Sequence, residues 1–302
     1  MWWSRRSAHG SRVRAASALA GGGGGGEALP SQTNAARARR AVSETESGQR
    51  ESTATVRGRR CAEPPDIAVA AFLLDALWSV GPKLIPFLKT ACLYFVLQPD
   101  QPCLSTVCFK CLPIISLIIF IFLNGISFSK EHAFSRRILT GLIFSCFGDA
   151  FLVWPSCFIL GVCMFAVAQI MYMTAFGFAP FNAKLGAFVY ALSAMIIYTL
   201  MPGLDGVLRV GVPVYTLLIG TMSWRAVARI QVFKKPWTWT KFCGGLGSIL
   251  FVISDTLLGF HHFHGPVPFA QYSIMSTYYV GQLGITLSTV DTIDNKISVA
   301  KR

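Results

Sequence analysis

Two aspartates, Asp149 and Asp255, lie well inside long apolar runs of this 302-residue chain. A carboxylate placed in hydrocarbon costs about 2.5–3.5 kcal/mol or more, so an acid inside a membrane helix is a functional candidate. The alternative is a structural role in which each acid bonds polar groups across a helix contact. Because burial and mutual repulsion oppose double ionisation, a pair of acids can divide into a protonated donor and an ionised partner. Acid–base hydrolysis requires that division.

The composition indicates the class of protein in which these acids lie. Hydrophobic residues make up 53% of the chain and charged residues 14%, and the mean hydropathy is +0.52. These values exclude an ordinary soluble domain. The formal net charge is +13, but the basic residues flank apolar runs and form no basic face interleaved with aromatics. We therefore expect a bilayer as the partner of the basic residues, and no nucleic acid.

The apolar runs predict an all-α fold, a polytopic membrane bundle of about eight transmembrane helices, with seven or nine as alternatives. Several runs are shorter than the roughly 20 residues of a straight span, so their ends are expected to shift by several positions. The expected helices cover residues 83–97, 108–123, 137–154, 158–176, 185–201, 207–224, 240–260 and 269–290.

The remaining segments differ in composition from the bundle. Residues 1–65 contain six consecutive glycines and few large apolar side chains, which predicts a disordered, basic, low-complexity extension. Its first twenty residues faintly resemble a mitochondrial presequence, because they combine Arg, Ser and Ala without an acid. Residues 66–82 are expected to form an interfacial lead-in, residues 83–291 the transmembrane domain and residues 292–302 a cytosolic tail.

Loop charges predict the orientation of the bundle. If the N-terminus is cytosolic, the opposite side receives only Lys110 and Arg209 of the cations between spans. This bias predicts that both termini are cytosolic and that the number of spans is even. The cations on the cytosolic side are Lys130, Arg136, Arg137, Lys184, Arg225, Arg229, Lys234, Lys235, Lys241, Lys296, Lys301 and Arg302.

Helical rise predicts that the two acids lie at similar depth. Asp149 follows Arg137 at a distance of roughly 18 Å along its helix, and Asp255 follows Lys241 at roughly 21 Å. Both helices run outward from the cytosol in the expected topology. The two carboxylates should therefore reach nearly the same level, past the midplane of the bilayer.

Other polar side chains in the spans are candidates for substrate contact. On the last span, Tyr278 should reach a depth similar to that of the acids, and Gln282 lies about one turn nearer the cytosol. The two lysines of the first span lie in the cytosolic half, where they could meet a lipid phosphate, although Lys83 could instead extend to the interface. The further candidates are Lys83, Lys89, Tyr94, Gln169 and Tyr172.

The sequence contains no clear signature of a metal site. His261-His262-x-His264 is interpreted as a polar loop, since no HExxH motif or matching carboxylate cluster accompanies it. Cys108-Phe-Lys-Cys111 has no second pair at zinc-finger spacing. A disulfide on the non-cytosolic side is possible but is not predicted. The absence of a GxSxG motif leaves a serine lipase mechanism without support.

Several segments together resemble the lysoplasmalogenase family of integral membrane proteins, also called YhhN-like. The similarity covers about residues 80–291 and all eight expected helices, and it is greatest to the vertebrate A-type members. The family's acidic motifs match Gly148-Asp149 and Ser254-Asp255, and its TYYxxQ motif matches residues 277–282. The segments are, in chain order, GPKLIPFLKTACLYFVL, CFKCLP, FGDAFLVW, MFAVAQIMYMTAFGF, FVISD and IMSTYYVGQ.

The resemblance implies a function for these residues. The family hydrolyses the vinyl-ether bond of lysoplasmalogens, without a known cofactor, to a fatty aldehyde and glycerophosphocholine or glycerophosphoethanolamine. Its animal members lie in the endoplasmic reticulum membrane. Asp149 and Asp255 would be catalytic, with Ser254, Tyr278 and Gln282 in contact with substrate or water.

One position departs from the family pattern. Gln169 stands where the family commonly has His before an aromatic, so a proton-carrying role of that His would not transfer to this chain. The chemistry otherwise parallels glycoside hydrolysis by two carboxylates, because both reactions proceed through an oxocarbenium ion. The alternative function is a proton-coupled transporter or lipid-binding membrane protein that uses the same acids.

Overall fold

The described part of the chain is all-helical, as expected. Apart from Pro65, the expected extension 1–65 and the tail 292–302 lie outside the described residues, so those two predictions stay predictions. The structure, a computed structural model, describes residues 65–97, 102–127, 129, 132–230 and 238–290.

Eight α-helices occur in the described residues, one for each helix expected from the sequence. Most ends shift by a few positions. The largest change is at the first helix, which begins at Pro65; the other ends shift by at most four positions. The helices are α2 (Pro65–Leu97), α3 (Leu104–Leu123), α4 (Ala133–Phe151), α5 (Phe158–Phe176), α6 (Ala183–Leu200), α7 (Leu208–Ala228), α8 (Trp239–Phe263) and α9 (Ala270–Leu287).

Five of these helices, α2, α3, α5, α6 and α8, are long and apolar enough to cross a membrane by length and composition. The other three are less apolar because they carry polar residues along their length. Asp149 lies on α4, Arg225 on α7, and Tyr278 and Gln282 on α9. Helices α4, α7 and α9, which are not candidate spans by hydropathy, therefore bring polar side chains into the bundle.

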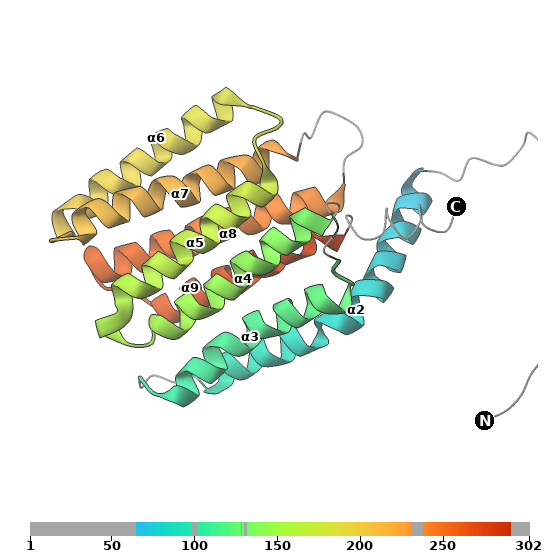
Figure 1. The fold of residues 1–302 in the computed structure, drawn as a ribbon, viewed down its shortest axis with the longest axis horizontal. Helices are drawn as coiled ribbons and strands as arrows, with labels where there is room; N and C mark the ends of the chain where they lie inside the picture. Colours follow the sequence, from blue (N-terminus) through green and yellow to red (C-terminus); the bar gives the residue numbers. More distant parts are fainter. Residues whose placement is uncertain (1–64, 98–101, 128, 130–131, 231–237, 291–302) are drawn as a thin grey trace, which may run out of the picture. The chain divides into compact units, whose positions relative to one another are not determined.

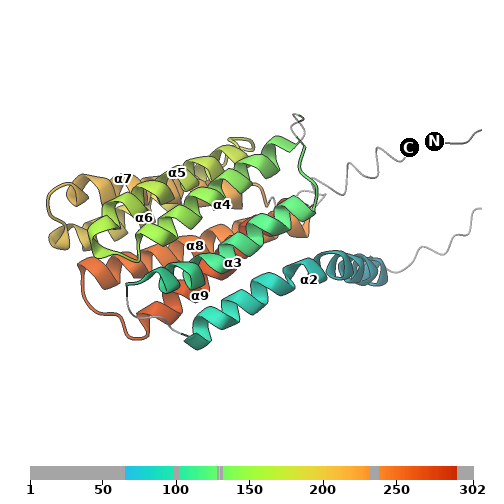
Figure 2. The same ribbon diagram turned by 60° about the horizontal axis from the view of Figure 1, so that its bottom comes forward.

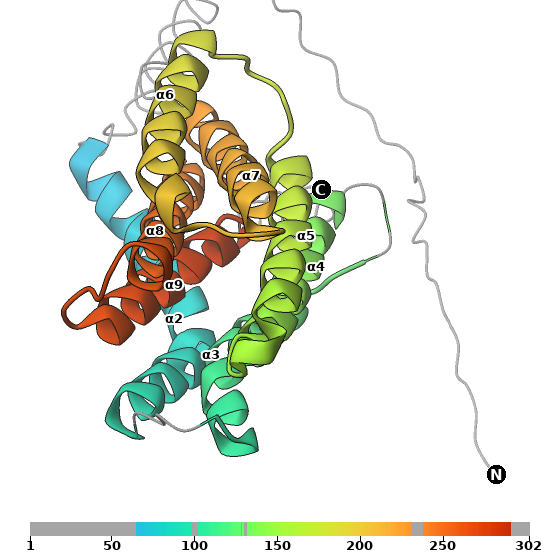
Figure 3. The same cartoon turned by 90° about the vertical axis from the view of Figure 1, so that its left-hand side faces the viewer.

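Consecutive helices pack as antiparallel pairs, with α4 against α5, α6 against α7 and α8 against α9 (Figure 1). The α5–α7 and α7–α8 contacts join these pairs, and α3 packs on α4 and α9 (Figure 2). Seen from one side in Figure 3, α6 and α7 lie at one end of the bundle and α3 at the other, with the α4–α5 and α8–α9 pairs between them. The central pairs carry both aspartates.

Helix α2 includes the segment expected as an interfacial lead-in. It begins at Pro65, so residues 66–82 belong to the same helix as the first expected span. Pro82 and Pro86 lie inside it, and the helix changes direction in Figure 1, as interior prolines cause by removing a backbone donor. Its C-terminal half contacts the bundle through side chains, including the ring of Tyr94 against that of Tyr279.

Glycines allow α8 and α9 to approach at backbone contact, as the glycine cluster of α8 predicted. A Cβ atom on Gly247 would lie 2.6 Å from the carbonyl oxygen of Gly281 and 2.7 Å from the backbone nitrogen of Ile285. A Cβ atom on Gly284 would lie 2.6 Å from the carbonyl oxygen of Cys243. This close contact fixes Asp255 on α8 relative to Tyr278 on α9.

Arg225, expected among the cytosolic loop cations, is buried within α7. Its guanidinium donates hydrogen bonds to the carbonyl oxygens of Gly177, at 2.7 Å, and Pro180, at 2.8 Å. Both carbonyls belong to the connection between α5 and α6. Because a guanidinium offers several donors in a fixed plane, this side chain holds the α5–α6 connection against α7.

Candidate active site

Asp149 and Asp255 line one cavity of about 850 Å³ within the described residues. Asp149 lies near the C-terminal end of α4, and Asp255 lies in the C-terminal half of α8. Most of the cavity wall is apolar and comes from α6, α7 and α8. The two acids that helical rise placed at similar depth therefore share one cavity. Their expected catalytic role stays a proposal.

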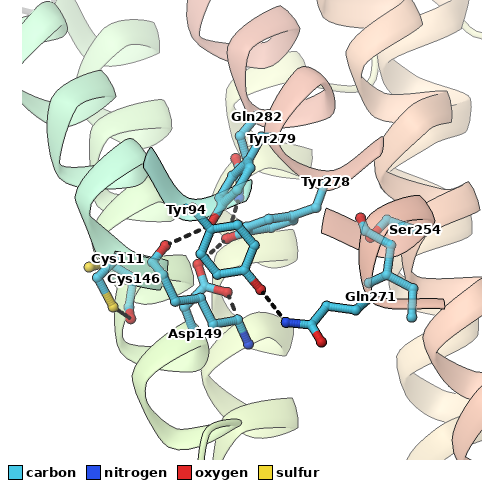
Figure 4. A network of polar contacts seen from close by, with 11 residues as sticks. Tyr94, Cys111, Cys146, Asp149, Ser254, Gln271, Tyr278, Tyr279 and Gln282 are labelled. Atoms are coloured by element: carbon cyan, nitrogen blue, oxygen red, sulfur yellow. Dashed lines mark hydrogen bonds and ion pairs between the residues drawn. The ribbon is translucent and has the colours of Figure 1, made fainter. Parts of the chain in front are cut away.

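The carboxylate of Asp149 is buried, with 2% of the residue exposed. The Tyr278 hydroxyl donates a hydrogen bond to its Oδ2 atom at 2.6 Å. The Lys110 Nζ atom lies 3.8 Å from its Oδ1 atom (Figure 4). A cation and a hydroxyl donor, from α3 and α9, thus both face this acid.

A chain of buried hydrogen bonds continues behind Tyr278. The Gln282 side-chain amide donates to the Tyr278 hydroxyl at 3.3 Å, and the Tyr172 hydroxyl donates to Gln282 Oε1 at 2.9 Å. Tyr172 also lies within 3.3 Å of the Ser145 hydroxyl. Tyr278 and Gln282 are four residues apart on α9 and therefore share one face of that helix. Gln282 and Tyr172 do not line the cavity, so they orient Tyr278 from behind.

The carboxylate of Asp255 accepts a hydrogen bond from a different tyrosine. The Tyr215 hydroxyl of α7 donates a hydrogen bond to Asp255 Oδ2. Each acid is thus held by one phenol, Tyr278 for Asp149 and Tyr215 for Asp255. Gln169 is fully buried near the Tyr215 hydroxyl and does not line the cavity.

The remaining substrate-contact candidates are divided between the cavity and other places. Tyr94 and Ser254 line the cavity. The Tyr94 hydroxyl accepts a hydrogen bond from Gln271 at 3.2 Å, and Ser254 donates to the Ile274 carbonyl at 2.9 Å (Figure 4). Lys83 and Lys89 do not line it: Lys83 bonds Asn124 Oδ1 at 2.6 Å, and Lys89 is exposed on α2.

Sequence reasoning missed Tyr215 and Lys110 as site residues. Lys110 was counted only as a cation of the non-cytosolic side, and Tyr215 was not singled out. Tyr215 lies about 10 Å along α7 from its start, and Asp255 about 12 Å before the end of the antiparallel α8. Helical rise therefore gives Tyr215 a depth similar to that of Asp255, but not the direction in which its side chain points.

Two residues of the histidine cluster belong to a helix and not to a loop. His261 and His262 lie in the last turn of α8 and line the cavity. No group of three potential metal ligands occurs among the described residues, and the eight cysteines described there are free thiols.

Comparison with known proteins identifies the family. Residues 105–289 match the model of the YhhN family. The chain belongs to the YhhN family. The matched region contains both aspartates, Lys110, Tyr215 and Tyr278. Together with its apolar helices, this membership makes the chain a multi-pass helical membrane protein.

Curated relatives of this YhhN protein are named lysoplasmalogenases. Lysoplasmalogenase TMEM86A of Bos taurus is 40% identical over 231 residues, which cover 74% of this chain and 96% of that protein. The Homo sapiens protein of the same name is 41% identical over 218 residues, covering 71% and 91%. Lysoplasmalogenase TMEM86B of Sus scrofa is 36% identical over 211 residues, covering 69% and 87%. No solved structure matches the chain. The resemblance drawn from the sequence, including its A-type character, is thus confirmed.

Proposed function

We propose that this YhhN protein is a membrane-embedded lysoplasmalogenase. It hydrolyses the vinyl-ether bond of lysoplasmalogens to a fatty aldehyde and glycerophosphocholine or glycerophosphoethanolamine. The names of its relatives support the substrate class. The observation that carries the mechanism is that Asp149 and Asp255 line the same largely apolar cavity.

The reaction needs one proton donor, one water and a stabilised cation. A proton is transferred to the alkenyl carbon that is not bonded to oxygen, and the neighbouring carbon and oxygen then share the positive charge of an oxocarbenium ion. Water adds to that carbon and loses a proton, which gives a hemiacetal. The hemiacetal breaks its bond to the glycerol oxygen, which takes up a proton, and the aldehyde is released. Two carboxyl groups supply these steps, as they do in glycoside hydrolysis.

The surroundings of the two acids support different roles for them. A nearby cation and a donated hydrogen bond both stabilise the negative charge of a carboxylate. Asp149 has both, from Lys110 and Tyr278, whereas among the described residues Asp255 has the hydrogen bond from Tyr215 alone. Asp149 is therefore the ionised partner that stabilises the cation and activates water, and Asp255 donates the proton to carbon.

The apolar wall accommodates the alkenyl chain. Phe188 and Leu192 of α6, together with Ile249 and Ile253 of α8, line the cavity and are also exposed, Phe188 to 66%. Side chains that reach both the cavity and the outer surface mark an opening between α6 and α8 on the lipid-facing side of the bundle. A single-chain lipid enters there from the bilayer without leaving an apolar environment.

The location follows from the same proposal. The cation distribution of the sequence favours cytosolic N- and C-termini. The family resemblance favours the endoplasmic reticulum membrane. The described residues carry the chemistry without a cofactor, because proton transfer and water addition need carboxyl groups alone.

The test is aldehyde release by the purified protein in lipid nanodiscs. We expect a fatty aldehyde from 1-alkenyl lysophospholipid and none from the saturated 1-O-alkyl analogue, because a saturated ether has no carbon that accepts the proton. Proton-dependent solute flux in proteoliposomes, with no aldehyde from the vinyl ether, would instead favour the transporter alternative.

A further inference from the structure

One end of the cavity is polar, and the acid–base pair does not account for it. Five polar lining residues lie at helix ends that meet here: Thr106 and Lys110 in the first two turns of α3, His261 and His262 in the last turn of α8, and Gln271 in the first turn of α9. Among the described residues, Lys110 is the only Lys or Arg whose side chain lines the cavity. Helices α3 and α9 also begin here, and the partial positive charge of a helix N-terminus favours anions.

The ammonium group of Lys110 has donors to spare. Its distance of 3.8 Å from Asp149 Oδ1 exceeds the roughly 2.7–2.9 Å of a charge-assisted hydrogen bond. No other polar partner of the Nζ atom occurs among the described residues, and the side chain is 15% exposed. Its backbone is held in place, because the Tyr279 hydroxyl donates to the Lys110 carbonyl at 3.0 Å (Figure 4). Lys110 therefore places an ammonium group in the cavity, and its N–H donors can bind a ligand.

His261 offers a further hydrogen-bond donor at the same end. Its Nδ1 atom accepts a hydrogen bond from the backbone N–H of Val267 at 3.1 Å, so the proton of the neutral ring lies on Nε2. His262 stacks on Phe158 with ring centroids 4.4 Å apart, which fixes the last turn of α8. The last turn of α8 thus places both histidines at the cavity wall.

The order of groups along α8 matches the order of groups in a lysophospholipid. His261 lies about 9 Å beyond Asp255 along the helix axis, and Ile249 lies about 9 Å before it. A polar end, an acid and an apolar wall therefore follow one another along the cavity. In a 1-alkenyl lysophospholipid, the vinyl ether likewise lies between a glycerol phosphate and an apolar chain.

We propose that Lys110, assisted by His261, binds the phosphate of a single-chain phospholipid. The glycerol then reaches toward Asp149 and Asp255, and the chain lies along the apolar wall. This inference rests on the proposed function for its orientation, since it places the vinyl ether between the two acids. It assigns to Lys110 the phosphate contact that the sequence assigned to Lys83 and Lys89.

The experiment compares two substrates that differ in the phosphate, 1-alkenyl lysophosphocholine and 1-alkenylglycerol, in nanodiscs of neutral lipid. Lys110→Gln is expected to raise KM for the phosphate-bearing substrate about 10–100-fold, the loss typical of a charge-assisted contact. KM for alkenylglycerol should stay within about twofold. Lys110→Arg should recover part of the loss, and His261→Gln should show a smaller effect of the same kind. Arg209→Gln is the matched control, because Arg209 is an exposed cation outside the cavity lining.

Equal losses of kcat on both substrates, with KM unchanged, would overturn the inference, because Lys110 would then act only through Asp149. Direct binding of 1-O-alkyl lysophosphocholine, which is not hydrolysed, supplies a readout independent of turnover. Lys110→Gln should weaken this binding and leave the binding of 1-O-alkylglycerol unchanged.

The binding readout also separates the inference from the proposed function. If the wild-type protein releases no aldehyde, the proposed function fails, and the binding comparison alone decides the phosphate site. Equal affinity for glycerophosphocholine and for the lipid analogue would contradict a lipid site and indicate one for soluble phosphate esters. If Lys110→Gln does not fold, the His261→Gln variant gives the same comparison with a smaller expected effect.

Discussion

Replacing Asp255 with asparagine is expected to lower kcat for lysoplasmalogen hydrolysis about 10²–10⁴-fold, the usual contribution of a positioned acid or base. The amide has nearly the shape of the acid and can still accept the Tyr215 hydrogen bond, but it cannot give a proton to carbon. Asp149→Asn should cause a loss of similar size, because it removes the charge that stabilises the oxocarbenium ion. The measurement is aldehyde release under saturating substrate.

The matched control for both variants is Asp205→Asn. Asp205 lies in the connection between α6 and α7, is exposed, and does not line the cavity. It should retain wild-type kcat, and all three variants should unfold at similar temperatures. Wild-type turnover in both Asp149→Asn and Asp255→Asn would show that the intramembrane acids are not the catalytic groups.

Replacing Gly247 with alanine is expected to destabilise the bundle by at least about 1–3 kcal/mol, the usual range for overpacking. The added methyl would meet the backbone of α9 at Gly281 and Ile285, and backbone cannot move aside as a flexible side chain can. Separation of α8 from α9 would also shift Asp255 relative to Tyr278, the hydrogen-bond donor to Asp149. Thermal unfolding in detergent should show a lower Tm, together with a loss of activity at temperatures where the wild-type protein is active.

Gly211→Ala is the control for this substitution. Gly211 lies in α7, and a Cβ atom there meets nothing within 4 Å. Alanine is favoured over glycine in a helix interior by about 1 kcal/mol, so this variant should keep or raise the Tm. A Gly247→Ala variant as stable as the control would mean that the α8–α9 backbone contact is looser than described.

Depth along a helix could be calculated from the sequence, and this explains what was predicted well. The common cavity of Asp149 and Asp255 agrees with their similar rise from the N-terminal ends of α4 and α8. The glycines of α8 predicted a close helix contact for a similarly local reason, since the absence of a side chain is itself the signal.

Rotation about the helix axis and the choice of neighbouring helix could not be calculated, because both depend on packing among distant segments. Lys83 and Lys89 have a suitable depth for a lipid contact but do not line the cavity, whereas Lys110 does. Tyr215 became a site residue only when α7 was packed beside α8. The sequence predicts Arg225 as a loop cation, because nothing local indicates that the α5–α6 connection needs its donors.

The most direct test of the central claim follows the proton onto carbon. The reaction is run in D₂O with 1-alkenyl lysophospholipid, and the aldehyde is trapped at once with a hydroxylamine for mass spectrometry. The mechanism predicts one deuterium on the carbon next to the aldehyde group, with a normal solvent isotope effect, in the wild-type protein. The Asp149→Asn and Asp255→Asn variants should form this product only at the greatly reduced rate. Release of aldehyde without deuterium at that carbon, or equal labelling rates in all three proteins, would contradict proton transfer from an intramembrane carboxylic acid.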